Sequence, residues 1–141
     1  MRRLVIDASV WVAALDASDE FSSRSREFLE SALKQRCGLE LPAHAPVEIA
    51  CALARRLRNP RLARDLAARL LHTPGLQVHT LTAELLERAG FLGTESLLRA
   101  ADAVYAALAN QLDGELVSWD TELIQRAAAR TPESWLIETP S

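Results

Sequence analysis

The sequence predicts an α/β fold, in which helices cover both faces of a central, mainly parallel sheet of about five strands. Short apolar segments rich in Leu, Val and Ile, which are typical of buried strands, recur along the chain. The segments between them carry apolar residues at helical spacing, and this alternation favours a parallel sheet. Because 141 residues can bury one core of this size, we expect residues 1–141 to form a single domain.

The elements in the first half of the chain are bounded by glycine, proline and asparagine. Gly38 and the Asn59-Pro60 pair end helices, and Pro46 suits the first turn of one. In order, these features predict a strand at 4–6, a helical turn at 10–15, a polar loop at 16–20, a helix over 22–36, a strand at 39–41, and helices over 47–57 and 61–71.

The second half continues the alternation of strands and helices. The Thr73-Pro74-Gly75 segment ends one helix, Thr82 is expected to cap the next, and Asp113-Gly114 is typical of a turn. In order, these features predict a strand at 76–79, a helix over 82–92, a loop at 93–96, a helix over 97–112 that is clearest from residue 102, a strand at 115–118, a helix over 121–130, and a last strand at 135–137.

Charge and cysteine content exclude several kinds of function. The net charge of −3 argues against a generally basic surface, although a local basic face remains compatible with it. Fifteen of the sixteen basic residues are arginine, and Lys34 is the sole lysine. Cys37 and Cys51 lack zinc-site spacing and are expected to be reduced and buried, which suits the cytoplasm. Asp7 interrupts the N-terminal apolar run, so we expect neither a signal peptide nor a membrane association.

Four acidic residues lie where the fold itself does not require an acid. Asp7, Glu48 and Asp120 follow the ends of predicted strands, and Asp102 lies at the beginning of an alanine-rich helix. Each acid alone is better explained as a helix cap or a first-turn residue than as a catalytic group. In an open parallel sheet, however, ligands bind beyond the carboxyl ends of the strands, and capping does not require four acids to meet there. Because all four acids are expected at this edge of the sheet, we predict that they form one site.

A converging group of carboxylates implies a cation, because like charges repel and unpaired burial is costly. Hard divalent cations such as Mg²⁺ or Mn²⁺ take oxygen ligands, and a pair of such ions promotes in-line attack on a phosphodiester. We therefore expect a Mg²⁺- or Mn²⁺-dependent enzyme that hydrolyses phosphodiester bonds. The four acids, Asp7, Glu48, Asp102 and Asp120, are its expected metal ligands and catalytic residues, with Glu48 binding either directly or through water.

The four acids and their flanking residues resemble the motifs of the PIN-domain ribonucleases, especially the VapC-type toxins of toxin–antitoxin systems. The matching segments are VIDASVWVAAL at 5–15, PVEIACAL at 46–53, AADAVYAALA at 100–109 and GELVSWDTEL at 114–123. One departure is Ala100, which follows Arg99 where the family often has a hydroxyl residue. The resemblance implies a PIN-like three-layer α/β/α sandwich and a divalent-metal-dependent endoribonuclease that hydrolyses RNA. It also implies a small antitoxin partner and a homodimer.

Several further residues are candidates for supporting roles. Ser9 and Ser118 could orient the acids or act as ordinary cap hydroxyls. Glu122 could extend the site, but a solvated first-turn acid is the simpler interpretation. We expect Trp11 and Trp135 in the core, whereas Trp119 remains open as a residue that stacks on bases.

An arginine-rich segment over 55–69 contains one acid, Asp65, against six arginines. Because arginine suits phosphate recognition, Arg55, Arg56 and Arg58 are candidate RNA-binding residues. A solvated helical face, or a face that meets an acidic partner, explains the same pattern.

Three other interpretations compete with a ribonuclease toxin. Haloacid-dehalogenase-like phosphatases require a second Asp where Ser9 stands, and both they and response-regulator receivers require a lysine near the later strands, far from Lys34. A non-toxin RNA-processing PIN nuclease and a non-catalytic PIN module that binds RNA or protein both remain alternatives.

Overall fold

The computed structural model describes residues 1–139, which contain one sheet of four parallel strands in the order β3-β2-β1-β4. The strands are β1 (Arg3–Ile6), β2 (Gly38–Pro42), β3 (Leu76–His79) and β4 (Glu115–Val117). The described helices are α1 (Ala8–Leu15), α2 (Ser22–Lys34), α3 (Ala45–Leu57), α4 (Pro60–Leu70), α5 (Ala83–Ser96), α6 (Ala100–Leu112), α7 (Thr121–Arg126) and α8 (Pro132–Glu138).

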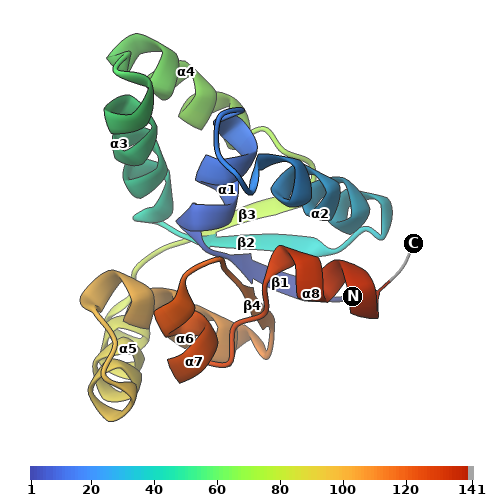
Figure 1. The fold of residues 1–141 in the computed structure, drawn as a ribbon. Helices are drawn as coiled ribbons and strands as arrows, with labels where there is room; N and C mark the ends of the chain where they lie inside the picture. Colours follow the sequence, from blue (N-terminus) through green and yellow to red (C-terminus); the bar gives the residue numbers. More distant parts are fainter. Residues whose placement is uncertain (140–141) are drawn as a thin grey trace.

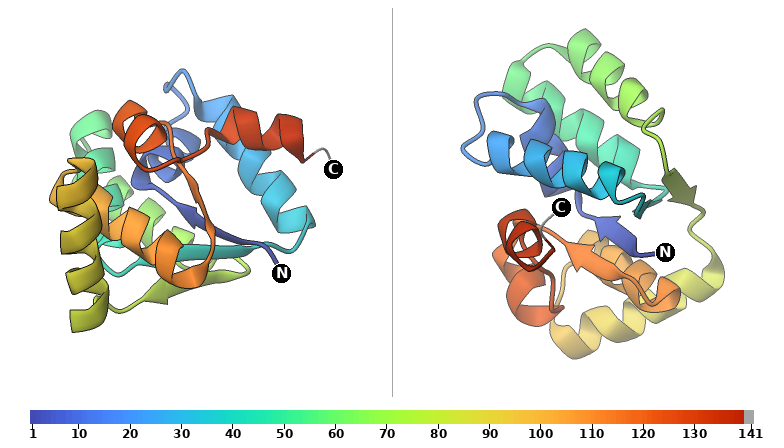
Figure 2. Two further views of the ribbon diagram at one scale, coloured as in Figure 1. Left: turned by 90° about the horizontal axis from the view of Figure 1, so that it is seen from below. Right: turned by 90° about the vertical axis from the view of Figure 1, so that its right-hand side faces the viewer.

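The helices form layers on the two faces of the sheet. Helices α1 to α4 lie over one face, and α5 and α6 lie over the other (Figures 1 and 2). Helix α8 packs against α2, and α6 contacts β1, β2 and β4. The three-layer α/β/α arrangement expected from the sequence is therefore confirmed.

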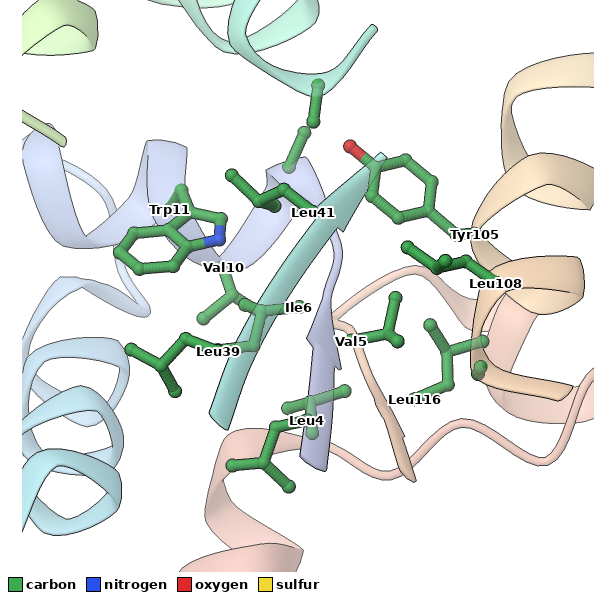
Figure 3. Close-up of a cluster of buried hydrophobic side chains, with 14 of the residues drawn as sticks. Leu4, Val5, Ile6, Val10, Trp11, Leu39, Leu41, Tyr105, Leu108 and Leu116 are labelled. Carbon is green, nitrogen blue, oxygen red and sulfur yellow. The ribbon is translucent and has the colours of Figure 1, made fainter. Parts of the chain in front are cut away.

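Strand β1 lies at the centre of the sheet, where Val5 is in register with Glu40 of β2 and Leu116 of β4. Alternate side chains of β1 point to opposite faces, as the pleat requires. Leu4 and Ile6 pack on the side of α1, and Val5 packs on the side of α6 (Figure 3). Because all three of these residues are fully buried, the strand is fixed in register and the position of the residue after it, Asp7, is fixed as well.

Several expected elements and boundaries are wrong. The expected fifth strand at 135–137 lies within α8, whose cap Thr131 accepts a hydrogen bond from the Ser134 N–H. The expected loop at 93–96 is the last turn of α5, and α6 begins at Ala100 rather than at residue 97. Helix α7 ends at Arg126, because residues 129 and 130 hydrogen-bond to Leu123 and to β4.

Other core predictions are confirmed in part. Trp11 and Trp135 are buried, as expected. Cys37 is also buried, but Cys51 is exposed, which contradicts the prediction that both thiols are inside; both cysteines are free. Within residues 1–139, no helix is both long enough and apolar enough to span a bilayer.

Candidate metal centre

Each of the four predicted acids lies at the beginning of a helix. Asp7 and Asp120 are the N-caps of α1 and α7, and their side chains accept hydrogen bonds from the N–H groups of Ser9 and Glu122. Glu48 and Asp102 lie in the first turns of α3 and α6. The positive ends of helix dipoles favour negative charge, which partly offsets the cost of gathering these acids.

These four helix beginnings meet around one pocket of about 480 Å³. Asp7, Glu48, Asp102 and Asp120 all line it, and they come from four segments that are far apart in the sequence. Its walls are formed by α1, α3, the beginning of α6 and the segment after β4. The fold therefore brings the acids together at the carboxyl edge of the sheet, where the topology predicts a ligand site.

Two serine hydroxyls connect the acids that follow β1 and β4. The Ser118 hydroxyl donates to Asp7 Oδ2 at 2.7 Å and accepts from the Asp120 N–H at 2.9 Å. The Ser9 Oγ lies 3.3 Å from Ser118 Oγ and accepts from the Trp119 N–H at 3.1 Å. Ser118 is fully buried, so its hydroxyl fixes the orientation of Asp7 relative to the segment that carries Asp120.

Glu48 is held by a tyrosine on a different helix. The Tyr105 hydroxyl of α6 donates to Glu48 Oε1 at 2.9 Å, and the ring itself is fully buried in the core (Figure 3). His44 Nε2 lies 3.7 Å from the same oxygen, and burial lowers the pKa of His44. Because lowering this pKa favours the neutral imidazole, the Tyr105 hydroxyl is the main group that fixes Glu48.

Asp102 is buried and lacks a hydrogen-bond partner on one oxygen. Its side chain is about 10% exposed, and among residues 1–139 its Oδ2 atom receives no hydrogen bond. One oxygen from each of Asp102, Asp120 and Glu122 lies within 4.8 Å of the other two. Unpaired buried carboxylate oxygens are costly, so this oxygen indicates a place for a cation.

The pKa values of three of the acids reflect this crowding. Burial raises the pKa of Asp7, and the charge of Asp120 raises it further, against the lowering effect of hydrogen bonds from Ser9 and Ser118. Burial, followed by repulsion from Asp120 and Asp7, raises the pKa of Asp102. The pKa of Glu48 is also raised, chiefly by burial. A divalent cation would stabilise the ionised form of each of these groups.

The donor set fits a hard divalent cation. The clustered atoms are carboxylate oxygens, which Mg²⁺ and Mn²⁺ prefer, and the helix beginnings place them on several sides of the pocket. Cys51 lines the same pocket, but it adds a single thiol to a site otherwise rich in oxygen donors.

The candidate RNA-binding arginines differ in their surroundings. Arg55 and Arg56 both line the pocket, but Arg56 is paired with Asp16 at 3.3 Å and Asp19 at 2.5 Å, and these ion pairs connect α3 to the loop between α1 and α2. Arg58 ends α3 in a left-handed conformation and is exposed. Of the three residues, Arg55 is the one whose position suits a role at the pocket.

Three residues near the acids were missed or given less weight from the sequence. Tyr105 is not among the site residues predicted above, although its place three residues after Asp102 puts both on one side of α6. Glu122 was interpreted as a solvated acid, yet it joins Asp102 and Asp120. Arg99 was noted only within a motif, and its contacts with these acids could not be predicted from sequence spacing. Trp119, in contrast, stacks on Phe21 with ring centroids 4.1 Å apart.

Comparisons with known proteins agree with this architecture. The model of the PIN domain family matches residues 4–129. Ribonuclease VapC3 of Pyrobaculum aerophilum is 32% identical over 132 residues, which cover 90% of this chain and 96% of that protein.

Two solved structures share the fold. The sarcin-ricin loop cleaving toxin VapC20 of Mycobacterium tuberculosis matches with a TM-score of 0.72 and 20% identity, covering 86% of this chain and 93% of that one. A toxin–antitoxin complex from Klebsiella pneumoniae matches with a TM-score of 0.63 and 15% identity, covering 92% and 97%. At these identities the two structures support the fold alone.

Proposed function

Because this chain belongs to the PIN domain family, we propose that it is a divalent-metal-dependent endoribonuclease and the toxin of a type II toxin–antitoxin pair. The curated relative of 32% identity is named a ribonuclease, which supports RNA as the substrate. We propose further that residues 1–141 act as a single PIN-like nuclease domain.

One observation carries this proposal: four acids from four separate segments line one pocket, and a buried oxygen of Asp102 lacks a hydrogen-bond partner within the described residues. A structural role as helix caps explains Asp7 and Asp120 individually, because both accept hydrogen bonds from their own helices. It does not explain Asp102, which accepts none on Oδ2. A cation-binding role accounts for the whole group.

In this proposal, the side chains divide the work between binding and orientation. Asp7, Asp102 and Asp120 hold Mg²⁺ or Mn²⁺, and Glu48 joins them directly or through water. A bound divalent cation supplies charge that polarises a phosphodiester and lowers the pKa of a water. Ser118 and Tyr105 keep the carboxylates of Asp7 and Glu48 in place, and ordered ligands reduce the cost of forming the site.

The proposed partners follow from the same family. One protein that shares this fold was solved as a toxin–antitoxin complex, which supports a small antitoxin partner for this chain. We propose a homodimer as the working unit. Size measurement of the purified protein by light scattering, alone and with the product of an adjacent small reading frame, tests both assignments.

The decisive experiment is an RNA cleavage assay with purified protein. We expect cleavage of single-stranded RNA in Mg²⁺ or Mn²⁺, loss of cleavage in EDTA, and loss of at least a hundredfold in rate for Asp7→Asn. Asp65→Asn is the matched control, because Asp65 is an exposed acid on α4 outside the pocket, and this variant should keep the wild-type rate.

Two results would refute the proposal. Cleavage that persists unchanged in EDTA would exclude the metal-dependent mechanism. Full activity of Asp7→Asn, with a circular dichroism spectrum like that of the wild type, would exclude the assignment of the site to this pocket.

A further inference from the structure

Arg99 brings a positive charge to the acidic pocket. It is the N-cap residue of α6, and its Nη2 atom lies 3.6 Å from Asp102 Oδ2, 3.5 Å from Asp120 Oδ2 and 3.5 Å from Glu122 Oε2. These three acids form the carboxylate cluster described above. The guanidinium group therefore lies close to the place that a cation would take.

The contacts of Arg99 are weak for an arginine among three carboxylates. Its side chain is 74% exposed, and within the described part of the chain the guanidinium makes no hydrogen bond to these acids. Exposed ion pairs of this kind are screened by water and contribute little to stability. A guanidinium group that is held so loosely can leave at low cost.

The neighbouring Arg126 shows how a fixed arginine differs. It donates a hydrogen bond to the Leu97 carbonyl at 2.8 Å and pairs with Glu122 at 3.2 Å. Arg126 is thus tied to the backbone, whereas Arg99 is placed by charge alone. The contrast indicates that Arg99 can exchange with another cation and that Arg126 cannot.

We propose that Arg99 is an exchangeable counter-ion that neutralises Asp102, Asp120 and Glu122 in the metal-free protein and leaves them when a divalent cation binds. This inference rests on the proposed metal centre. It follows that Arg99 opposes metal binding, because a divalent cation must displace the guanidinium group from the three carboxylates and then lie near its positive charge. It also follows that the metal-free site depends on Arg99 to limit carboxylate repulsion.

A further consequence concerns the substrate. The displaced guanidinium group stays at the rim of the pocket, which Arg55 lines from α3. A guanidinium group suits a phosphate oxygen, since its planar fork of donors matches the geometry of that group. Metal binding would thus release a phosphate-binding group at the beginning of α6.

The test is calorimetric titration of Mn²⁺ into metal-free protein, with no RNA present. We expect Arg99→Gln to bind Mn²⁺ roughly three- to tenfold more tightly than the wild type, because the competing charge is absent. Arg99→Lys keeps the charge and should bind Mn²⁺ within about twofold of the wild type. Arg26→Gln, an exposed residue of α2, removes the same charge elsewhere and should leave the affinity unchanged.

Thermal unfolding provides the second measurement. Without metal, Arg99→Gln should melt only slightly below the wild type, and saturating Mn²⁺ should raise its melting temperature by more than it raises that of the wild type. A purely structural role for Arg99 as the N-cap of α6 predicts equal losses with and without Mn²⁺.

The outcomes separate this inference from the proposed function. If the wild type binds Mn²⁺ and Arg99→Gln binds it equally or more weakly, the exchange is refuted while the metal centre stands. If neither protein binds Mn²⁺, the metal centre is refuted and the exchange with it.

Discussion

At the scale of single residues, we expect the Ser118 hydroxyl to affect both the stability of the fold and the affinity of the pocket for metal. It is fully buried, donates to Asp7 and accepts from the backbone of Asp120. We expect Ser118→Ala to lower the free energy of unfolding by about 1–3 kcal/mol, because it leaves the Asp120 N–H without this acceptor and removes one of the hydrogen bonds to Asp7. We also expect a roughly 10- to 100-fold loss in Mn²⁺ affinity, because Asp7 loses its orientation. Urea unfolding and calorimetric titration measure the two effects.

The chain contains a matched control for this substitution. Ser22 is also buried, but its hydroxyl has no hydrogen-bond partner among residues 1–139. Ser22→Ala should therefore leave both stability and Mn²⁺ affinity close to the wild-type values, or raise the stability slightly. Equal effects of the two substitutions would show that the Ser118 network has no special role.

Because the pKa values of these acids are raised, we expect the metal-free site to lower the free energy of unfolding at neutral pH. In the unfolded chain, Asp102 titrates near pH 4, whereas burial and the neighbouring acids raise its pKa in the folded protein. Between these two pKa values, the folded protein holds the extra proton, so the contribution of Asp102 to stability falls as pH rises through this window. Asp102→Asn removes the buried charge that lowers the stability of the wild type above this window. We therefore expect the metal-free variant to be more stable than the metal-free wild type at pH 7.

Urea unfolding in EDTA at pH 4 and pH 7 measures this effect. The stability difference between Asp102→Asn and the wild type should be small at pH 4 and should grow to roughly 1 kcal/mol at pH 7. Mn²⁺ should stabilise the wild type and have little effect on the variant. A variant that is less stable than the wild type at pH 7 without metal would contradict the idea that burial and the neighbouring acids outweigh the charge of Arg99 at Asp102.

At the scale of elements, the contact between α5 and α6 determines where Asp102 lies. A Cβ atom at Gly93 would lie 2.8 Å from the Cβ of Ala103, the residue next to Asp102, whereas a Cβ atom at Gly90 would meet nothing within 4 Å. We expect Gly93→Ala to lower the free energy of unfolding by about 1–3 kcal/mol through overpacking. Gly90→Ala, three residues earlier on the same helix, should raise it by up to about 1 kcal/mol.

Thermal unfolding of the two variants tests this difference, and Mn²⁺ titration shows whether α6 moves. Because Ala103 adjoins Asp102, Gly93→Ala should also weaken Mn²⁺ binding, whereas Gly90→Ala should not. Similar stabilities for both variants would indicate that α5 can shift away from α6 without cost.

Gly93 also explains one error in the sequence-based element boundaries. A glycine after a helical pattern predicts a helix end, but close approach between two helices requires a glycine equally well, and only the fold distinguishes these cases. Helix α5 actually ends at Ser96, and its C-cap Leu97 adopts φ 58° without being glycine. The segment at 135–137 is similar: three apolar residues fit a strand or a buried helix, although Thr131 and Pro132 are a typical helix start.

At the scale of the whole molecule, the sequence predicts the location of the acids better than their environment. Asp7 and Asp120 follow β1 and β4, and parallel neighbouring strands must end at one edge, so their proximity follows from topology. The contact of Tyr105 with Glu48 joins residues that are 57 positions apart and depends on how the sheet places α3 and α6 relative to one another. Similarly, the surroundings of Arg99 depend on how close the beginning of α7 lies to the beginning of α6. Such contacts have no local pattern in the sequence.

A protein of net charge −3 needs local positive charge to bind RNA. Binding must rely on a few arginines at the pocket, and Arg55 lines it, whereas Arg26 on α2 does not. In the Asp7→Asn background, which prevents cleavage, we expect Arg55→Glu to weaken binding of single-stranded RNA and to reduce the slope of log affinity against log salt by about 0.7 for each lost phosphate contact. Arg26→Glu changes the net charge equally and should leave the slope unchanged. Equal losses for both variants, measured by fluorescence anisotropy at several salt concentrations, would show that overall charge rather than the pocket rim governs binding, because only a direct phosphate contact distinguishes the two positions.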